Sequence, residues 1–386
     1  MLRRIGTCSV IFAGLLCSSS ALATNFAQTG PVAFTEAAPP TGFLPGNSDI
    51  SVLTPNAAGR YPLVVATHGW SAGRVNQMGW ARHLASYGYV VIAPGMPNPL
   101  QPDQAVWSAN VRTIAQNATN PSLFPQIAAK IDATKVVYEG FSAGGLASTL
   151  AAKVQAPALL VLLDPVDNNN QGAAAMPSIC SPVLSVFTQP SGCNNQMGWS
   201  AYASTGTGPL VRMGIKASTH CDGEDEARAL CGTFCGGAAK TTNRDSIRKY
   251  MVAYLEWKLR GNQEAAALFA PSALSADTAL EGTSVVDRPA CGGSPAVDAG
   301  TPAPVDAGGG TNTDAGLPPA SDGGAPSTGD AGATADAGSS NVDGGESDGG
   351  TTADGGCACS TVRAAKLSPL ALFLALVPFA RRRRSR

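Results

Sequence analysis

The amino-acid sequence predicts an α/β fold in which a mostly parallel β-sheet is covered by helices on both faces, and three observations support this. Short apolar runs, typical of strands buried on both faces, alternate along the chain with longer helical patterns. Polar residues with catalytic potential directly follow several of these runs. Between residues 135 and 154 a strand-like run, a glycine-rich turn and a helical run follow one another, with Ser142 at the turn. Because alternating strands and helices are joined by right-handed crossovers, the strands are expected to run parallel.

The predicted elements lie between residues 45 and 270, after a polar and proline-rich beginning. The first helical pattern ends at Gly88, and the strand after it is closed by Pro94 and Gly95. Apolar runs predict strands at 49–53, 61–67, 89–93, 135–138, 158–163, 182–187 and 210–216. Amphipathic patterns predict helices at 76–87, 103–117, 145–154 and 245–269.

The turn at residues 140–144 reads Gly-Phe-Ser-Ala-Gly, which matches the G-x-S-x-G pattern of a nucleophile elbow. The chain has 44 glycines, so the pattern alone could arise by chance. The strand before it and the helix after it are the context that the elbow requires. Gly140 and Gly144 are expected to lie where a Cβ atom would strike the neighbouring backbone. We therefore interpret Ser142 as a nucleophile at the N-terminus of a helix.

A serine nucleophile needs an imidazole base, and the chain has three histidines. His83 falls inside a predicted helix and is interpreted as structural. His68 directly follows a predicted strand, in a position suited to shaping an oxyanion loop. His220 follows the last predicted strand, so the order of serine, acid and histidine is that of an α/β-hydrolase triad. His220 is therefore the predicted base, with a purely structural role as the alternative.

The base in turn needs a carboxylate. The loop after the fifth buried strand, residues 188–195, contains no carboxylate. Asp164 is the first residue after the preceding strand and is the predicted acid, with Asp167 as the alternative. Asp222 is too close to His220 in sequence to reach the far side of its ring. The oxyanion is expected to be bound by the backbone N–H groups of Ala143 and Trp70.

Residues 45–270 resemble an α/β-hydrolase of the group that contains dienelactone hydrolases, chlorophyllases and cutinase-like polyester hydrolases. Residues 68–70, His-Gly-Trp, are similar to the oxyanion loop of the group, and residues 140–145 to its elbow. Residues 163–167 resemble the Asp-Pro-Val segment that bears the acid in chlorophyllases. Residues 217–220 are similar to the histidine segment of cutinase-like enzymes, which place their acid one strand later. The resemblance implies an α/β-hydrolase fold and an ester substrate.

The two ends of the chain differ in composition from the middle, which divides the sequence into four parts. Residues 1–23 have the basic, apolar and A-x-A regions of a secretory signal peptide. Residues 24–291 form the predicted catalytic domain. Residues 292–356 are rich in Ala, Gly and Asp, carry ten acidic and no basic residues, and predict a disordered stalk. Residues 357–386, with paired cysteines, a short apolar run and a terminal arginine cluster, resemble the MYXO-CTERM sorting signal, with an ordinary anchor helix as the alternative.

Six cysteines in the predicted catalytic domain suggest up to three disulfides in an exported protein. They are Cys180, Cys193, Cys221, Cys231, Cys235 and Cys291. Proximity along the chain favours Cys180 with Cys193, and Cys221 with Cys231 or Cys235, although the sequence does not choose among the connectivities. The alternative is a zinc site that uses His220 with Cys221, Cys231 and Cys235, which the exported compartment disfavours. We expect no metal and no cofactor.

Together these features predict a secreted or surface-anchored serine hydrolase of carboxylic esters. The catalytic domain has 17 basic and 17 acidic residues, which gives no reason to expect a nucleic-acid partner. A membrane contact is expected only through the C-terminal segment, and a monomer is expected. Only a short segment separates Asp167 from Pro182, so no large lid is expected and the cleft suits bulky or polymeric esters. The alternatives are a peptidase or amidase on the same fold and a catalytically silent binding domain.

Overall fold

The computed structural model describes residues 24–47, 49–194, 197–205, 208–226, 228 and 231–288. All of them lie in the first of two compact units of the chain, residues 1–306 and 307–386. The predicted signal peptide, stalk and C-terminal sorting segment lie outside the described residues. Among the helices formed by the described residues, none is both long and apolar enough to span a membrane.

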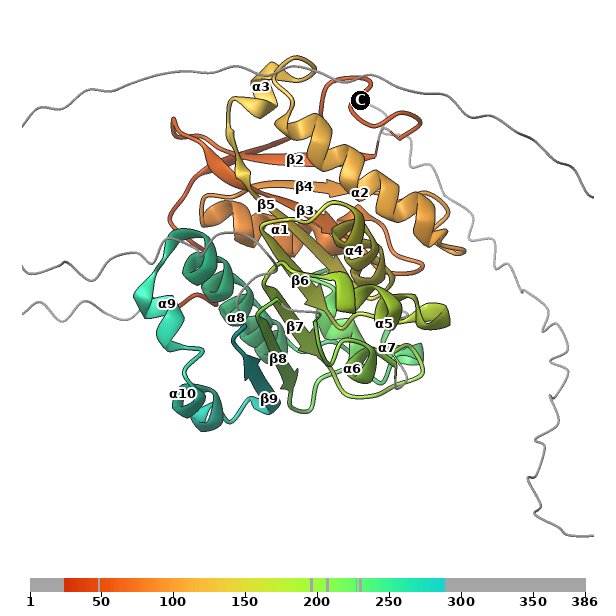
Figure 1. Ribbon diagram of the computed structural model, residues 1–386, viewed down its shortest axis with the longest axis vertical. Helices are drawn as coiled ribbons and strands as arrows, with labels where there is room; N and C mark the ends of the chain where they lie inside the picture. Colours follow the sequence, from red (N-terminus) through yellow and green to blue (C-terminus); the bar gives the residue numbers. More distant parts are fainter. Residues whose placement is uncertain are drawn as a thin grey trace, which may run out of the picture. The chain divides into compact units, whose positions relative to one another are not determined.

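One sheet of nine strands runs through the described residues, in the order β1-β2-β4-β3-β5-β6-β7-β8-β9 (Figure 1). The six strands from β3 to β8 pair in parallel, whereas β1, β2 and β9 pair antiparallel at the two edges. The strands are β1 Phe34–Ala37, β2 Ile50–Pro55, β3 Tyr61–Thr67, β4 Val90–Pro94, β5 Ile131–Phe141, β6 Leu159–Leu163, β7 Val183–Phe187, β8 Leu210–Ile215 and β9 Leu280–Val286.

Helices cover both faces of this sheet, and each face has its own apolar core. Trp80 of α1 and Met251 of α8 pack in one core, and Trp107 of α2 and Ala147 of α4 in the other. The helices are α1 Met78–Ser86, α2 Gln104–Thr119, α3 Pro125–Ala128, α4 Ala143–Val154, α5 Gln171–Ala175, α6 Met197–Ala201, α7 Cys231–Phe234, α8 Thr241–Arg260, α9 Gln263–Ala267 and α10 Pro271–Ala276. The parallel strands all present their carboxyl ends at one edge of the sheet, where loops can bring distant residues together.

The predicted C-terminal helix over 245–269 is wrong in its bounds. Helix α8 ends at Arg260 because Gly261 adopts a left-handed conformation with φ 67° and caps the helix. Asn262 then caps α9 by accepting the N–H of Ala265. The structure also adds the edge strands β1 and β9, which carry no continuous apolar run. Nearly all of their residues are exposed or only partly buried, which explains why an apolar pattern does not reveal them.

Candidate active site

Ser142 stands on a sharp turn between strand β5 and helix α4. Its backbone has φ 54° and ψ −119°, a conformation that L-residues rarely adopt. Two glycines make the turn possible. A Cβ atom on Gly140 would lie 2.3 Å from the carbonyl oxygen of Gly144, and one on Gly144 would lie 2.3 Å from that of Thr67. The strained turn thus holds the serine hydroxyl above the carboxyl edge of the sheet, as a nucleophile elbow requires.

The side chains of the three predicted triad residues form one hydrogen-bonded series. His220 Nε2 lies 2.9 Å from Ser142 Oγ, and His220 Nδ1 lies 2.6 Å from Asp164 Oδ2. All three residues are buried. They come from three places along the chain: the turn after β5, the end of β6, and the segment after β8. This arrangement lets the imidazole accept the serine proton while the carboxylate fixes the ring orientation.

The two other carboxylates considered near His220 have different partners. Asp167 accepts the backbone N–H of Gly172 at 2.6 Å and that of Ala173 at 3.1 Å, so it caps helix α5. Asp222 accepts hydrogen bonds from the backbone of Thr219 and from Asn243, each at 2.8 Å. Both carboxylates therefore hold backbone segments, and the carboxylate against the imidazole is that of Asp164.

Asp164 is itself held by a loop that contributes no carboxylate. Thr188 donates to Asp164 through both its backbone N–H, at 3.1 Å, and its hydroxyl group. The side-chain amide of Asn194 donates to Asp164 Oδ2 at 2.8 Å. Asp164 has a positive φ of 42°, so these bonds stabilise a carboxylate on a backbone that is itself strained. Four donors, counting His220, converge on one side chain.

The predicted oxyanion loop after β3 is fixed by His68. The ring Nδ1–H donates to the carbonyl of Gly69 at 2.8 Å, and Nε2 accepts the N–H of Met96 at 2.7 Å. Burial lowers the pKa of His68 from 6.5 to about 4, so the ring is neutral at neutral pH and can make both bonds. Trp70 follows, with its indole N–H on the carbonyl of Leu100 at 2.8 Å. Trp70 and Ala143 both line the cleft beside Ser142.

Replacing His68 with leucine is expected to lower kcat about tenfold or more for any ester, with little change in KM, because the loop that carries Trp70 loses both ring hydrogen bonds. Steady-state kinetics of the folded variant measure this. The matched control is His83→Leu. His83 lies on α1, away from the loop, and is also buried. Burial lowers its pKa to about 4 as well, and its Nε2 bonds the carbonyl of Phe26. The control should lose stability and keep kcat, and equal losses of kcat in both variants would contradict the assigned role.

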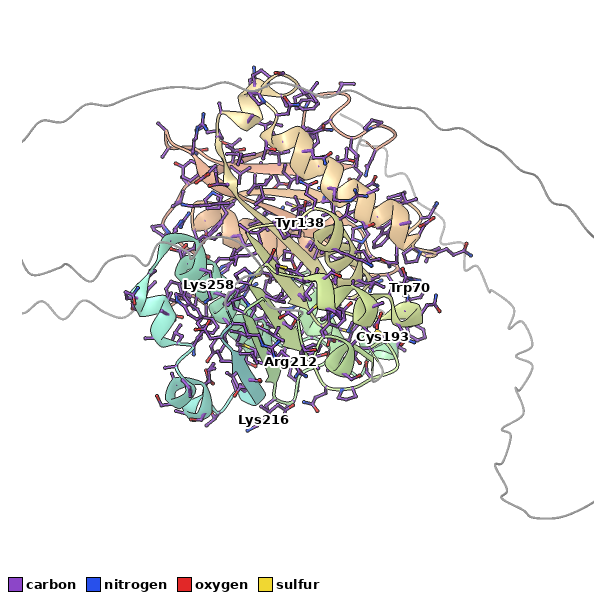
Figure 2. The ribbon with its side chains drawn as sticks, viewed as in Figure 1. Trp70, Tyr138, Cys193, Arg212, Lys216 and Lys258 are labelled. Carbon is purple, nitrogen blue, oxygen red and sulfur yellow. A yellow bond between two sulfur atoms is a disulfide. The ribbon has the colours of Figure 1, made fainter. Side chains whose placement is uncertain are left out.

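A cleft of about 1070 Å³ opens over the triad and is lined by Ser142 and His220. Trp70 is 53% exposed and Phe234 is 70% exposed, and both contribute to its walls. Figure 2 labels Trp70 and Cys193, which both border this cleft. Arg228 also lies on the wall, but its guanidinium pairs with the buried Glu224 at 2.6 Å, so its charge is offset. The walls thus combine exposed aromatic rings with little net charge.

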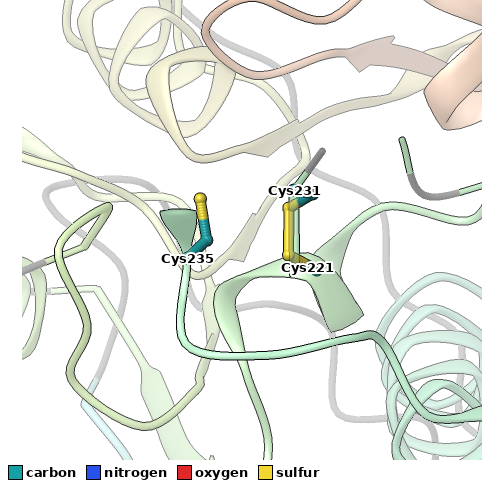
Figure 3. A group of neighbouring side chains, drawn as sticks. All are labelled: Cys221, Cys231 and Cys235. Atoms are coloured by element: carbon teal, nitrogen blue, oxygen red, sulfur yellow. A yellow bond between two sulfur atoms is a disulfide. The ribbon is translucent and has the colours of Figure 1, made fainter. Parts of the chain in front are cut away.

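Two disulfides lie in the cleft wall, Cys193–Cys235 and Cys221–Cys231. Figure 3 shows the Cys221–Cys231 bond with Cys235 beside it. The expected pairing of Cys221 with Cys231 is confirmed, but the expected pairing of Cys180 with Cys193 is wrong, because the fold brings Cys193 to Cys235, 42 residues away in sequence.

The sulfur atoms of Cys221, Cys231 and Cys235 lie within 4.8 Å of one another. In disulfides they are not the thiolates that zinc binds, and both ring nitrogens of His220 are occupied, which argues against the alternative zinc site.

Comparison with known families adds to this geometry. Residues 35–190 match the family model of chlorophyllase. The matched segment runs from β1 to the loop after β7 and includes Ser142 and Asp164, but it ends before His220. The chain has the α/β-hydrolase fold. The predicted fold class is confirmed, including helices on both faces of a mostly parallel sheet. No curated protein matched the chain in the sequence search.

Sequence reasoning missed Thr188 and Asn194, the residues that donate hydrogen bonds to Asp164. The loop after β7 contains no carboxylate, the group that a triad acid requires. Its polar side chains were a usable signal, because the loop follows the strand next to β6 and so lies at the same edge of the sheet. Phe234 was also missed, because its short helix α7 carries no periodic pattern.

Proposed function

We propose that the protein is a serine esterase that hydrolyses carboxylic esters through a covalent acyl-enzyme. The observation that carries this proposal is the series of hydrogen bonds from Ser142 through His220 to Asp164 on a nucleophile elbow. The match to the chlorophyllase family supports a hydrolase, and an esterase within that class. A binding domain has no need of three such residues in contact.

The proposed reaction begins when Ser142 Oγ attacks the ester carbonyl carbon while His220 Nε2 takes the hydroxyl proton. Asp164 stabilises the imidazolium that forms. The oxyanion accepts hydrogen bonds from the backbone N–H groups of Ala143 and Trp70. Ala143 is the first residue of α4, where the N–H groups have no partner within the helix. The tetrahedral intermediate expels the alcohol, which receives the proton from Nε2. Water then attacks the acyl-enzyme by the same steps and releases the acid.

The cleft favours a bulky apolar ester as the substrate class. Its volume of about 1070 Å³ exceeds the needs of an acetyl group. The exposed rings of Trp70 and Phe234 offer apolar surface that a long acyl chain or a polymer segment would cover. Because charge on the wall is offset by the Arg228–Glu224 pair, an uncharged substrate suits the cleft better than an ionic one.

The test is hydrolysis of p-nitrophenyl esters from acetate to palmitate by the purified protein, with labelling of Ser142 by a fluorophosphonate probe. We expect turnover of at least part of the series and labelling that Ser142→Ala abolishes. Absence of turnover on every ester, with no labelling, would reject the proposal in favour of a binding domain. Cleavage of amides in preference to esters would instead identify the protein as a peptidase or amidase.

Phe234→Ala is expected to lower kcat/KM about tenfold for long-chain esters and to leave acetate hydrolysis nearly unchanged, because only a long chain reaches the ring and covers it. The chain-length profile of the variant measures this. Leu123→Ala is the matched control, since Leu123 is similarly exposed, at 57%, and does not line the cleft. A uniform loss across the series would show that Phe234 does not contact the acyl chain.

We further propose that the protein acts outside the cytoplasm, secreted or anchored at the cell surface. The two disulfides support this, because disulfides persist in oxidising compartments. The predicted signal peptide at residues 1–23 supports it as well. Fractionation of the producing cells, with detection of the catalytic domain in the cytosol alone, would reject it.

A further inference from the structure

Asn194 connects the triad acid to the backbone of the loop that surrounds it. Its amide nitrogen donates to Asp164 Oδ2 at 2.8 Å, to Thr188 Oγ1 at 3.1 Å and to the carbonyl of Gln189 at 3.0 Å. Its carbonyl oxygen accepts from the backbone N–H of Ser191 at 2.7 Å and from the Ser191 hydroxyl at 2.8 Å. The amide is thus bonded at both ends, and a smaller side chain would break every one of these contacts.

Asn194 is partly buried and borders open space on two sides. The residue lines the catalytic cleft on one side. It also lines a second cavity of about 340 Å³, whose walls include Asp164 and Thr188. The loop therefore has open space on two sides, where a buried segment would have packed neighbours. Its position depends on hydrogen bonds and on its covalent attachments.

One covalent attachment lies directly beside Asn194. The preceding residue, Cys193, is bonded to Cys235. Cys235 follows helix α7, whose first residue, Cys231, is bonded to Cys221, the neighbour of His220. A path through two disulfides therefore joins the residue beside Asn194 to the residue beside the base. The loop that holds the acid and the segment that carries the base are fastened to the same short helix.

We propose that Asn194 is a positioning residue for Asp164 and that the Cys193–Cys235 disulfide keeps it in position. The inference rests on the proposed esterase function. Reduction of this disulfide by an added dithiol, which is itself oxidised as the two cysteines take up two electrons and two protons, releases the loop. Asn194 then leaves Asp164, the carboxylate keeps only its bonds from Thr188 and is held less firmly against the imidazole, and turnover falls. Activity is thereby tied to the oxidised state of one disulfide.

The decisive variant is Asn194→Ala in the full chain, because it leaves every cysteine in place. We expect kcat for p-nitrophenyl butyrate to fall about a hundredfold with little change in KM. The acidic limb of the kcat/KM profile should move to lower pH, because an imidazole without its carboxylate partner is harder to protonate. In an Asp164→Asn background the same change should cost nothing more, since Asn194 acts through Asp164.

Asn262→Ala serves as the structural control, because Asn262 caps α9 and lies outside both cavities. It should lower stability and leave the pH profile unchanged. An unchanged kcat in Asn194→Ala, a profile that stays in place or moves to higher pH, or an additive loss in the Asp164→Asn background would each overturn the proposal.

The role of the disulfide is tested by Cys193→Ser/Cys235→Ser and by titrating the wild type with dithiothreitol. We expect the double variant to match Asn194→Ala and to show no additive loss with it. In the titration, activity should fall in step with the appearance of thiols at Cys193 and Cys235, read by alkylation and mass spectrometry. Full activity with both thiols free would overturn this part, and the titration still decides it if the double variant fails to fold.

A readout independent of turnover separates this inference from the proposed function. The proton between His220 Nδ1 and Asp164 can be observed by NMR at low field. Its signal should be present in the wild type and lost in Asn194→Ala. If the wild type neither turns over esters nor reacts with a fluorophosphonate, the esterase proposal fails, while loss of this signal still supports the positioning role. If the wild type is active and the signal persists in the variant, only the positioning role fails.

Discussion

Ser142→Ala is expected to reduce ester hydrolysis roughly 10⁴-fold to 10⁶-fold, leaving only the residual rate that substrate binding and the oxyanion N–H groups supply. The alanine has no hydroxyl to form the acyl-enzyme, while the cleft and the backbone N–H groups of the oxyanion loop remain. Substrate binding should therefore be nearly unchanged. Stopped assays with a p-nitrophenyl ester measure the loss, and binding of a non-hydrolysable ester analogue measures what remains. Turnover within tenfold of wild type would reject Ser142 as the nucleophile.

The paired aspartate variants give the same test for the acid. Asp164→Asn is expected to lower kcat roughly 10³-fold to 10⁴-fold, because the amide cannot hold the imidazole in the tautomer that accepts the serine proton. Asp167→Asn should keep most of the activity and lose about 1 kcal/mol of stability, since Asp167 caps α5 through Gly172 and Ala173. Kinetics and thermal unfolding of the two variants decide between the carboxylates. The reverse pattern, with Asp167→Asn inactive, would reassign the acid.

The parts of this site that the sequence predicted are those determined by local pattern. The apolar runs placed β3 to β8 within a few residues of where the structure has them, apart from the early beginning of β5. Parallel strands present their carboxyl ends at one edge, so residues directly after β5, β6 and β8 were expected to meet there. The contacts of His220 with Ser142 and Asp164 have this origin.

The parts that could not be predicted depend on contacts between segments far apart in the chain. The pairing of Cys193 with Cys235 requires the loop after β7 to lie against α7, and no local pattern carries that information. The hydrogen bond from Asn194 to Asp164 spans 30 residues. The end of helix α8 at Arg260 could have been predicted from the sequence. A glycine often ends a helix, and an asparagine after it often caps the next one.

The position of Asp164 after β6 explains why the contacts of Thr188 and Asn194 with it were not predicted. The resemblance to two groups of hydrolases left two strand ends as sites for the carboxylate, and the carboxylate that contacts His220, that of Asp164, follows β6. The loop after β7 then has no carboxylate to supply, but it still adjoins the triad. It supplies Thr188 and Asn194, which donate to the carboxylate of the neighbouring strand. The loop after β7 thus holds the carboxylate of Asp164, which follows the neighbouring strand β6.

A further prediction with a large expected effect concerns Glu139 and the stability of the protein. The side chain lies on β5, three residues before Ser142, and is 1% exposed. Within the described part of the chain neither carboxyl oxygen has a hydrogen-bond partner. Burial raises the pKa of Glu139 from 4.5 to about 8, so the group is protonated in the folded protein at neutral pH.

The sign of the pH effect follows from the difference between the pKa of Glu139 in the folded protein, about 8, and its ordinary value of 4.5 in the unfolded chain. Between about pH 4.5 and pH 8 the folded state binds a proton that the unfolded state has released, so the free energy of unfolding falls as pH rises. From pH 6.5 to pH 9 the wild type should lose about 2 kcal/mol from this group, and the loss should level off above about pH 8. Burial lowers the pKa of His68 and His83 from 6.5 to about 4, so these two residues raise stability as pH rises, mostly below pH 6.5 and to a small extent up to about pH 7.5. This contribution is the same in the wild type and in a Glu139 variant, so the difference between their slopes belongs to Glu139.

Glu139→Gln should remove this pH dependence, because the amide does not ionise. Urea unfolding at pH 6.5, 7.5 and 9 measures the free energy of unfolding, and the readout is its slope against pH. Burying the glutamine amide costs the same free energy at every pH, so it does not change this slope. Asp132→Asn on the same strand is the matched control, because a hydrogen bond from Thr134 lowers the pKa of Asp132 and places its effect below the window. The control should keep the wild-type slope. If the wild-type slope persists in Glu139→Gln, Glu139 does not cause it. Glu139 would then be ionised in the folded protein, and a partner near the turn at Ser142 would have to stabilise its carboxylate.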